Sequence, residues 1–323
     1  MLCGCDTRKK IRMSDILTVT VNPALDVLTT IDRVTDSHKM RCGPTLKHPG
    51  GGGVNVARVL HRLGASCQAV YLAGGVTGER HRRLLLDEGV RCHTVPMAEE
   101  TRESFSVREL STGHDYRFVL PGPLVADTEW QACLDDVSQH LPKKFLVLSG
   151  GLAQGVPDDF LARLAHLAKA RGVRVVLDSN GPALAPALRE GVYLFKPSLR
   201  ELQAFTGQDL SDTASQIDAA RQLIAQGQAE VVALSLGEAG ALLVSAQESW
   251  QAASIRVEVK TTIGAGDSFV AGMVWALNRE DTLLRAFQVG MASGAAALLA
   301  PGTSLSQAAD VHALLPQLVV SAV

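Results

Sequence analysis

The chain has 323 residues, of which 46% are hydrophobic and 20% are charged, and its 31 basic and 33 acidic side chains leave a formal net charge of −2. This composition is that of an ordinary globular protein. It lacks the basic excess that nucleic acid or an anionic membrane surface would require, so we expect small-molecule partners, no nucleic acid and no membrane.

The cysteines and the N-terminal segment bear on the location of the protein. The six cysteines form no CxxC pair and no repeated spacing, which argues against a disulfide framework and a structural zinc site. No apolar run approaches the roughly 18 residues of a membrane-spanning helix, and residues 1–14 lack the apolar segment of a signal peptide. We therefore expect a cytoplasmic protein in which residues 1–14 are a disordered extension.

Short apolar runs alternate with helical patterns along the chain. The runs are bounded by turn or polar residues, as buried parallel strands are, and cover residues 16–21, 69–72, 145–148, 173–177, 192–195 and 231–234. Apolar residues at three- and four-residue spacing predict helices over residues 54–63, 78–88, 158–170 and 213–226, and two more, 283–299 and 306–318, close the core. This order predicts an α/β fold with a mostly parallel central sheet flanked by helices.

Two segments break the alternation and predict a second, smaller sheet. Residues 26–46 and 94–120 are β-rich, and the later one contains a hairpin whose strands, 105–110 and 116–120, are joined by a polar turn. Because both segments interrupt strand–helix units, we expect them to meet as a β-lid over one end of the core, formed from about residues 26–48 and 94–121. The alternative is two unrelated surface excursions.

Asp26 lies just past the first strand, at the carboxyl end where α/β sheets place ligands. Its carboxylate can accept hydrogen bonds from two sugar hydroxyls. The alternative is a structural aspartate, which is common in a turn after Asn-Pro.

A run of four glycines, residues 50–53, leads into the helix predicted from residue 54. The entropic cost of four glycines indicates a ligand close to the backbone, and a small polyol contacted by backbone N–H groups and the Asn55 amide fits. A dinucleotide-binding loop is the competing interpretation. It is weaker, because no clear apolar strand precedes the run and no acidic residue ends a second strand about 20 residues later.

The sharpest motif is Gly264-Ala265-Gly266-Asp267, which precedes an apolar helical pattern. Free backbone N–H groups at such a helix start, unhindered by side chains, bind phosphate oxygens. Asp267 is then placed to accept the proton of a substrate hydroxyl while the amides stabilise charge on a transferring phosphoryl group. On this motif alone, an aspartate that caps the helix explains the sequence equally well. The Walker loop and the protein-kinase HRD and DFG motifs are absent.

Three cations lie in the expected lid: Lys39, Arg41 and Arg102. Each can neutralise a substrate phosphate, arginine through a bidentate fork and lysine as a point charge. Taken singly, each is also explained as a solvated surface cation.

The glycine run with Asn55 and the loop ending in Asp267, about 210 positions apart, resemble the two signatures of the PfkB (ribokinase-like) carbohydrate kinases. The resemblance extends from residue 16 to the C-terminus and implies that residues 15–323 form a ribokinase-like kinase domain. Within the family the chain is most similar to the sugar-phosphate branch, which contains minor bacterial 6-phosphofructokinases, 1-phosphofructokinases and tagatose-6-phosphate kinases. The resemblance also implies a homodimer formed through the lid.

By position, the resemblance implies roles for individual residues. The residues expected to hold sugar hydroxyls are Asp26, Gly51, Gly52 and Asn55. Lys39 and Arg102 are expected to face the substrate phosphate. Asp267 is the expected base, and Gly264, Ala265 and Gly266 form the anion loop, which binds the transferring phosphoryl group. The expected ATP site comprises Lys196, Glu201, Ser235, Gly237, Gly240 and Gly302, with Glu201 organising the Mg²⁺ of MgATP indirectly. Ser198 replaces the asparagine of the family's Lys-Pro-Asn-x-x-Glu segment. Ala300 replaces an asparagine near a monovalent-cation site, so the resemblance leaves a K⁺ requirement open.

The function expected from this resemblance is ATP-dependent phosphorylation of fructose 6-phosphate to fructose 1,6-bisphosphate. Fructose 1-phosphate, tagatose 6-phosphate and an unphosphorylated sugar or nucleoside are alternative substrates, of which the lid cations disfavour the uncharged ones. A sugar-phosphate sensor that kept the fold without catalysis is the alternative from another class, and an intact Asp267 with its glycine loop argues against it.

Overall fold

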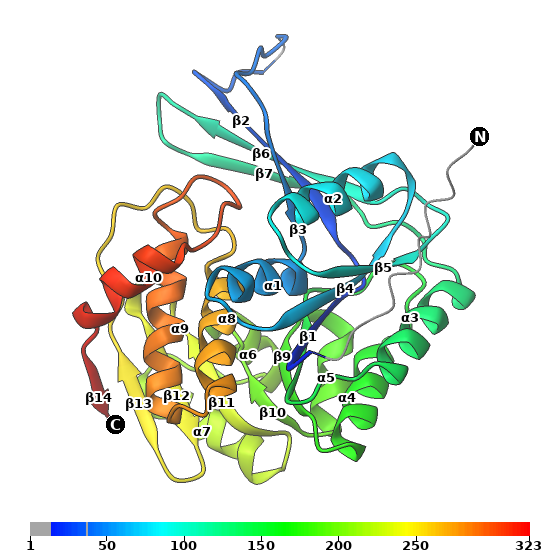
Figure 1. Ribbon diagram of the computed structural model, residues 1–323. Coiled ribbons are helices and arrows are strands. Elements are labelled where there is room, and N and C mark those ends of the chain that lie inside the picture. The colour runs from blue at the N-terminus through cyan, green and yellow to red at the C-terminus, as the bar shows by residue number, and fades with distance from the viewer. Residues whose placement is uncertain (1–13, 37) are drawn as a thin grey trace.

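The computed structural model describes residues 14–36 and 38–323 (Figure 1). The disordered extension expected over residues 1–14 lies outside the described residues except at its last position. Ser14 is buried, and its hydroxyl donates a hydrogen bond to the Ile16 carbonyl at 2.7 Å. Ser14 therefore belongs to the folded domain and not to an extension.

Within the described residues, a ten-stranded sheet forms the centre of the protein. From edge to edge its strands are β14 (Val320–Ala322), β13 (Ser249–Ala252), β12 (Ala241–Ser245), β11 (Ala229–Ser235), β10 (Val192–Phe195), β9 (Arg174–Asp178), β8 (Phe145–Ser149), β1 (Ile16–Thr20), β4 (Cys67–Ala73) and β5 (Cys92–Pro96). Neighbours from β5 to β11 are parallel. From β11 to β14 they are antiparallel.

Helices cover both faces of this sheet and bury its apolar side chains in two separate clusters (Figure 1). One face carries α3 (Asp127–Gln139), α4 (Phe160–Ala170), α5 (Leu184–Arg189), α6 (Leu199–Thr206) and α7 (Thr213–Ala225). The other carries α1 (Gly52–Arg62), α2 (Gly75–Asp87), α8 (Ala265–Asn278), α9 (Leu283–Ala297) and α10 (Ala308–Leu314). The predicted α/β fold with flanking helices is thus confirmed, and none of the helices described is long and apolar enough to cross a membrane.

The chain order of the sheet places a switch point beside its first strand. Strand β1 lies between β4, the next strand of this sheet along the chain, and β8, which comes much later in the chain. In open α/β sheets, ligands bind outside the carboxyl ends of the strands at such a point. The segments that follow β1 and β8 are therefore the places to look for a site.

A separate four-stranded sheet projects beyond this end of the core (Figure 1). Its order is β3 (Leu46–Gly50), β2 (Ala24–Ile31), β6 (Arg102–Glu109) and β7 (Asp115–Val119). The two β-rich segments do meet, through the parallel pair β2 and β6. Residues 94–96, expected in the lid, instead belong to β5 of the large sheet. Strand β3 runs directly into the glycine run, but its sequence, Leu-Lys-His-Pro-Gly, is not the apolar strand that a dinucleotide-binding loop follows.

Candidate active site

Helix α8 begins within the motif that contains Asp267. Gly264 precedes the helix with a φ of 77°, and Asp267 is the third helical residue. The first N–H groups of the helix have no intrahelical acceptor and face the loop. Both hydrogen bonds that the Asp267 carboxylate makes among the described residues are to side chains, and neither is to an N–H group of the helix start. The carboxylate accepts a hydrogen bond from Asn55 Nδ2 at 2.8 Å and lies 3.5 Å from the Ser149 hydroxyl, so the geometry favours a carboxylate facing a site over a helix cap.

The glycine run packs against the carboxyl ends of β1 and β8. A Cβ at Gly51, whose φ is 119°, would lie 2.9 Å from Thr20 Cγ2, and one at Gly52 would collide with the Ser149 hydroxyl and lie 2.8 Å from the Gly150 nitrogen. The absence of side chains lets helix α1 start directly beside Ser149. Asn55 is thereby brought to Asp267 across 212 positions of sequence.

His81 on α2 supports the same run, and no sequence motif marks this residue. Its Nε2 lies 3.0 Å from the Gly50 carbonyl, and burial lowers the pKa of His81 to about 4. The imidazole is therefore neutral at physiological pH, with Nε2–H donating to Gly50.

Asp26 on β2 is buried at the base of the lid, against Gly50. Burial raises the pKa of its carboxyl, against the opposing effect of Arg117 and a hydrogen bond from Thr303. The pocket that contains Asp26 extends across the lid and the core. Its polar and glycine lining is Asn22, Asp26, Gly51, Gly52, Asn55, Arg102, Ser104, Arg117, Gly150, Gly151, Gly264 and Asp267.

Two lid arginines line this pocket, and one of them was missed. Arg102 donates to the carbonyls of Leu120 and Asn22, both at 3.2 Å, while its buried Nε has no hydrogen-bond partner. Arg117 was not predicted, yet the alternation of β7 places it on the opposite face from Phe118, beside Ser106 of β6. Lys39 is exposed and does not line the pocket in this structure.

Lys196, one of the residues expected to bind nucleotide, lies close to the anion loop, Gly264–Gly266. Lys196, which follows β10, pairs with Asp178 at 3.1 Å, and its Nζ would lie 3.5 Å from a Cβ placed at Gly266. Burial lowers the pKa of Lys196, but the nearby carboxylates of Asp178, Glu201 and Asp267 outweigh it, so the net shift is upward. A permanent ammonium thus lies under the loop that would bind phosphate.

Glu201 is held at the start of α6 by a capping box. Its Oε2 accepts from the Ser198 backbone N–H at 2.7 Å and the Ser198 hydroxyl at 2.8 Å. Serine in place of asparagine thus serves as a helix cap that orients the glutamate. Ser235, at the end of β11, donates its N–H to the Pro197 carbonyl at 3.0 Å, which places it beside this segment.

The three glycines expected at the nucleotide differ in their surroundings. Gly237 has a φ of 62° with nothing within 4 Å of a Cβ position, so a ligand can approach its backbone. A Cβ at Gly240 would collide with the Ala252 carbonyl, and one at Gly302 would collide with Leu28 of the lid. Packing between strands and between lid and core explains these last two glycines without a nucleotide.

Burial raises the pKa of Asp267 to about 6, with the Asp178 charge adding to the shift, while Asn55 and Lys196 oppose it. Because the folded protein holds this proton more tightly than the unfolded chain, stability falls as pH rises from the ordinary value of 3.8 through 6. The cost at neutral pH is about 1–3 kcal/mol.

Asp267→Asn should therefore raise the melting temperature at pH 7.5, since asparagine removes the charge and keeps an acceptor for Asn55. The gain should shrink toward pH 4, where the native carboxyl is protonated. Melting curves of both proteins at the two pH values test this. A variant that is less stable than the wild type at pH 7.5 would contradict the buried-charge explanation.

Comparisons with known proteins identify the family of this chain. A model of the pfkB family carbohydrate kinases matches residues 21–310. The ATP-dependent 6-phosphofructokinase isozyme 2 of Mycobacterium tuberculosis is 42% identical over 92% of this chain and 88% of its own length. The 1-phosphofructokinase of Bacillus subtilis is 30% identical over 95% of this chain and 99% of its own.

A solved structure agrees in fold over nearly the whole chain. The crystal structure of phosphofructokinase-2 from Escherichia coli in complex with fructose-6-phosphate superposes with a TM-score of 0.89 at 35% identity, covering 94% of this chain and 99% of that one. The predicted membership is confirmed by the family match and by these relatives. The chain belongs to the pfkB family of carbohydrate kinases and is a phosphotransferase that acts on an alcohol acceptor.

Proposed function

We propose that this sugar-phosphate kinase transfers the γ-phosphoryl group of ATP to the O1 hydroxyl of fructose 6-phosphate. The observation that carries the proposal is one pocket that combines the Asp267 carboxylate, the open start of α8 and two lid arginines. The relatives named as 6-phosphofructokinases, and the E. coli structure with fructose-6-phosphate, support this substrate.

In this mechanism the sugar lies between the glycine run and the lid. Asp26 and the Asn55 amide contact its hydroxyls, and Arg102 and Arg117 face its phosphate. Asp267 accepts the O1 proton as the O1–P bond forms, and the bond between Pγ and the bridging oxygen breaks, with the electron pair leaving on ADP. The N–H groups at the start of α8 stabilise the charge on the γ-phosphoryl oxygens.

The nucleotide side suits MgATP. Among the residues described, no three histidine, cysteine or acidic side chains converge on one point, so the protein offers no complete cage for a metal. Mg²⁺ does not need one, because it keeps several waters and binds mainly through substrate phosphates and one or two carboxylates. We assign this role to Glu201, which caps α6, and to Asp178, which pairs with Lys196. The ion would neutralise phosphate charge there.

The test is a panel of sugars and sugar phosphates in a coupled ADP-release assay. We expect the highest kcat/KM with fructose 6-phosphate. A higher kcat/KM with fructose 1-phosphate, the substrate class indicated by the name of the B. subtilis relative, would replace the proposed substrate and retain the proposed phosphoryl transfer. Ligand binding without ADP formation for any compound would instead favour the sensor. The same assay with K⁺ replaced by Na⁺ tests the cation requirement.

We also propose that the second sheet is a lid through which two chains dimerise. It exposes Leu46 on edge strand β3, Phe118 and Val119 on edge strand β7, and Phe105 on the neighbouring β6, at 37% to 57% of their full surface. Such edge strands can pair with another copy. Phe118→Asp should convert a dimer to a monomer in light scattering at micromolar concentration. Val319→Asp, at a residue 76% exposed outside the lid, is the control that should stay dimeric. A wild-type monomer, or a Phe118→Asp dimer, would contradict this interface.

A further inference from the structure

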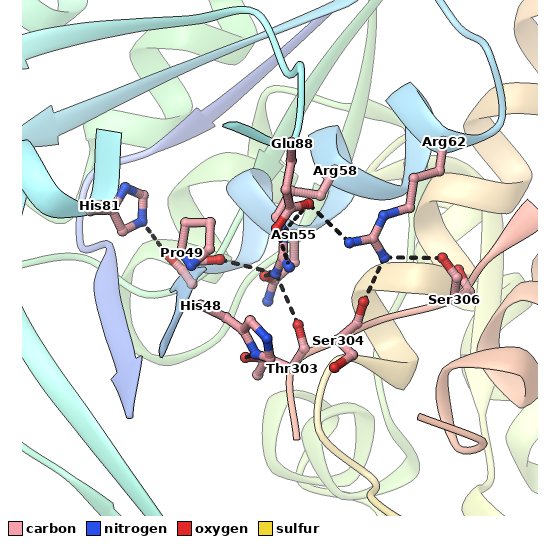
Figure 2. A network of polar contacts seen from close by, with 11 residues as sticks. His48, Pro49, Asn55, Arg58, Arg62, His81, Glu88, Thr303, Ser304 and Ser306 are labelled. Atoms are coloured by element: carbon pink, nitrogen blue, oxygen red, sulfur yellow. Dashed lines mark hydrogen bonds and ion pairs between the residues drawn. The ribbon is translucent and has the colours of Figure 1, made fainter. Parts of the chain in front are cut away.

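One face of helix α1 carries both a substrate-side amide and a buried arginine. Asn55 and Arg58 are three residues apart and therefore neighbours on the helix surface. The Arg58 residue has 0% exposure, which is unusual for a permanently charged side chain. The sequence suggested no role for it. Figure 2 shows its guanidinium at the centre of a polar network.

The Arg58 guanidinium forms an ion pair along one edge and hydrogen bonds to backbone carbonyls along the other. Nε lies 3.0 Å from both carboxylate oxygens of Glu88, and Nη2 lies 2.6 Å from Oε1, so the charge is neutralised by a bidentate pair. Nη1 donates to the carbonyls of Pro49, at 3.1 Å, and Thr303, at 3.0 Å. Arg58 therefore ties the end of β3 to the loop after α9.

The same Nη1 lies 3.4 Å from Oδ1 of Asn55 (Figure 2). The Nδ2 of Asn55 donates to the Asp267 carboxylate at 2.8 Å. The amide is thus set between a cation on its oxygen side and a carboxylate on its nitrogen side. Turning it over would place the oxygen against Asp267 and the NH₂ group against the guanidinium, and both contacts would be repulsive. This arrangement selects one orientation of the Asn55 amide.

We propose that Arg58 is a positioning residue that acts through Asn55 to hold the Asp267 carboxylate in place for proton transfer. The inference rests on the proposed role of Asp267 as proton acceptor. It adds that catalysis depends on a residue that touches neither sugar nor nucleotide. With Arg58 gone, the Asn55 amide loses its fixed orientation, and the hydrogen bond that favours ionised Asp267 weakens.

Other charges also face Asp267, and the test must separate them from Arg58. Asp178 comes from β9, Lys196 follows β10, and Asp26 lies on β2. Arg58 also acts on Asp26 by charge alone. Arg58→Lys keeps the positive charge beside Glu88, but the single ammonium group cannot contact Asn55, Pro49 and Thr303 together. The variant therefore retains the charge and loses the contacts that orient the Asn55 amide.

The experiment compares the pH dependence of kcat/KM in the wild type and Arg58→Lys. The wild type should lose activity as pH falls through about 6, where the base becomes protonated. In Arg58→Lys this acid limb should move upward by on the order of one pH unit, the scale of a weakened hydrogen bond to a charge. Turnover on the plateau should also fall.

Arg62→Lys is the matched control. Arg62 lies one turn further along α1, pairs with the same Glu88 at 2.9 Å and donates to the Ser304 and Ser306 carbonyls without touching Asn55 (Figure 2). It should lower the melting temperature and leave the acid limb unmoved. If Arg58→Lys lowers only the melting temperature in the same way, Arg58 is merely structural and the inference is overturned.

Two further variants keep the inference testable if Arg58→Lys does not fold. Glu88→Gln keeps Arg58 but weakens the ion pair that holds its guanidinium. It should move the acid limb in the same direction as Arg58→Lys, by a smaller amount. In a protein that already carries Asn55→Ala, adding Arg58→Lys should cause no further shift of the acid limb, because the amide that links Arg58 to Asp267 is absent. A shift as large as the one that Arg58→Lys causes alone would overturn the inference. A wild type without an acid limb near pH 6 would instead overturn the proposed base, and this inference with it.

Discussion

Asp267→Asn is expected to lower kcat by about 10²–10⁴-fold while sugar-phosphate and ATP affinities stay close to those of the wild type. The carboxylate lines the pocket and bonds to the Asn55 amide and the Ser149 hydroxyl. Asparagine keeps the shape and accepts the same Asn55 hydrogen bond, but it cannot accept the hydroxyl proton at neutral pH. The loss should therefore appear in turnover and not in binding.

The measurement combines steady-state kinetics with calorimetric titration of each substrate. Asp87→Asn, at an exposed position on α2, is the control and should leave kcat unchanged. Near-normal turnover in Asp267→Asn would show that another group accepts the proton. A loss of binding in place of turnover would show that Asp267 holds the sugar.

Arg102→Met is expected to lower kcat/KM for a phosphorylated sugar by about 10–100-fold, the scale of a charge-assisted hydrogen bond lost to an anionic ligand. Arg102 lines the pocket with a buried Nε that has no protein partner. A substrate phosphate in the pocket would face the Arg102 guanidinium and pair with its charge. The slow phosphorylation of unphosphorylated fructose should change much less, because no anion is lost.

The ratio of the two kcat/KM values is the measurement, since it cancels any general loosening of the lid. That correction is needed because Arg102 also donates to the Leu120 and Asn22 carbonyls. Arg83→Met, at an exposed arginine on α2, should leave the ratio unchanged. An unchanged ratio in Arg102→Met would place the substrate phosphate elsewhere.

The central strands were predictable because each is a short apolar run buried on both faces. All five residues of β1 and of β8 are buried, and their apolar runs alone located both strands. The antiparallel edge was not anticipated. Strands β13 and β14 have four and three residues, and their pairing depends on the last residues of the chain returning to the sheet.

The substrate side of the site was predictable where a motif carried the signal. Asn55 and Asp267 lie in two glycine-rich motifs, and the fold brings them into contact. Arg117 was missed because alternation tells which side chains share a face but not which face meets the core. Arg58 was missed because an arginine in an amphipathic helix is usually solvated, and only the fold supplies Glu88 and the carbonyls that bury it.

The nucleotide side of the site was the hardest part to predict from the sequence, because its contacts depend on the fold. Lys196 and Asp178 meet only because β9 and β10 are parallel neighbours whose carboxyl ends coincide. Gly240 and Gly302 match expected positions, yet close packing against Ala252 and Leu28 explains them. A glycine required by packing looks the same in a sequence as one that admits a ligand.

The most direct test of the proposed function is to identify the product. The wild-type protein is incubated with MgATP and fructose 6-phosphate, and the sugar is examined by ³¹P NMR and mass spectrometry, with Asp267→Asn in parallel. The proposal predicts ADP and fructose 1,6-bisphosphate in equal amounts, with the new phosphate on O1, and almost none from the variant. ADP without a bisphosphate, a phosphate on another oxygen, or equal product from Asp267→Asn would contradict it.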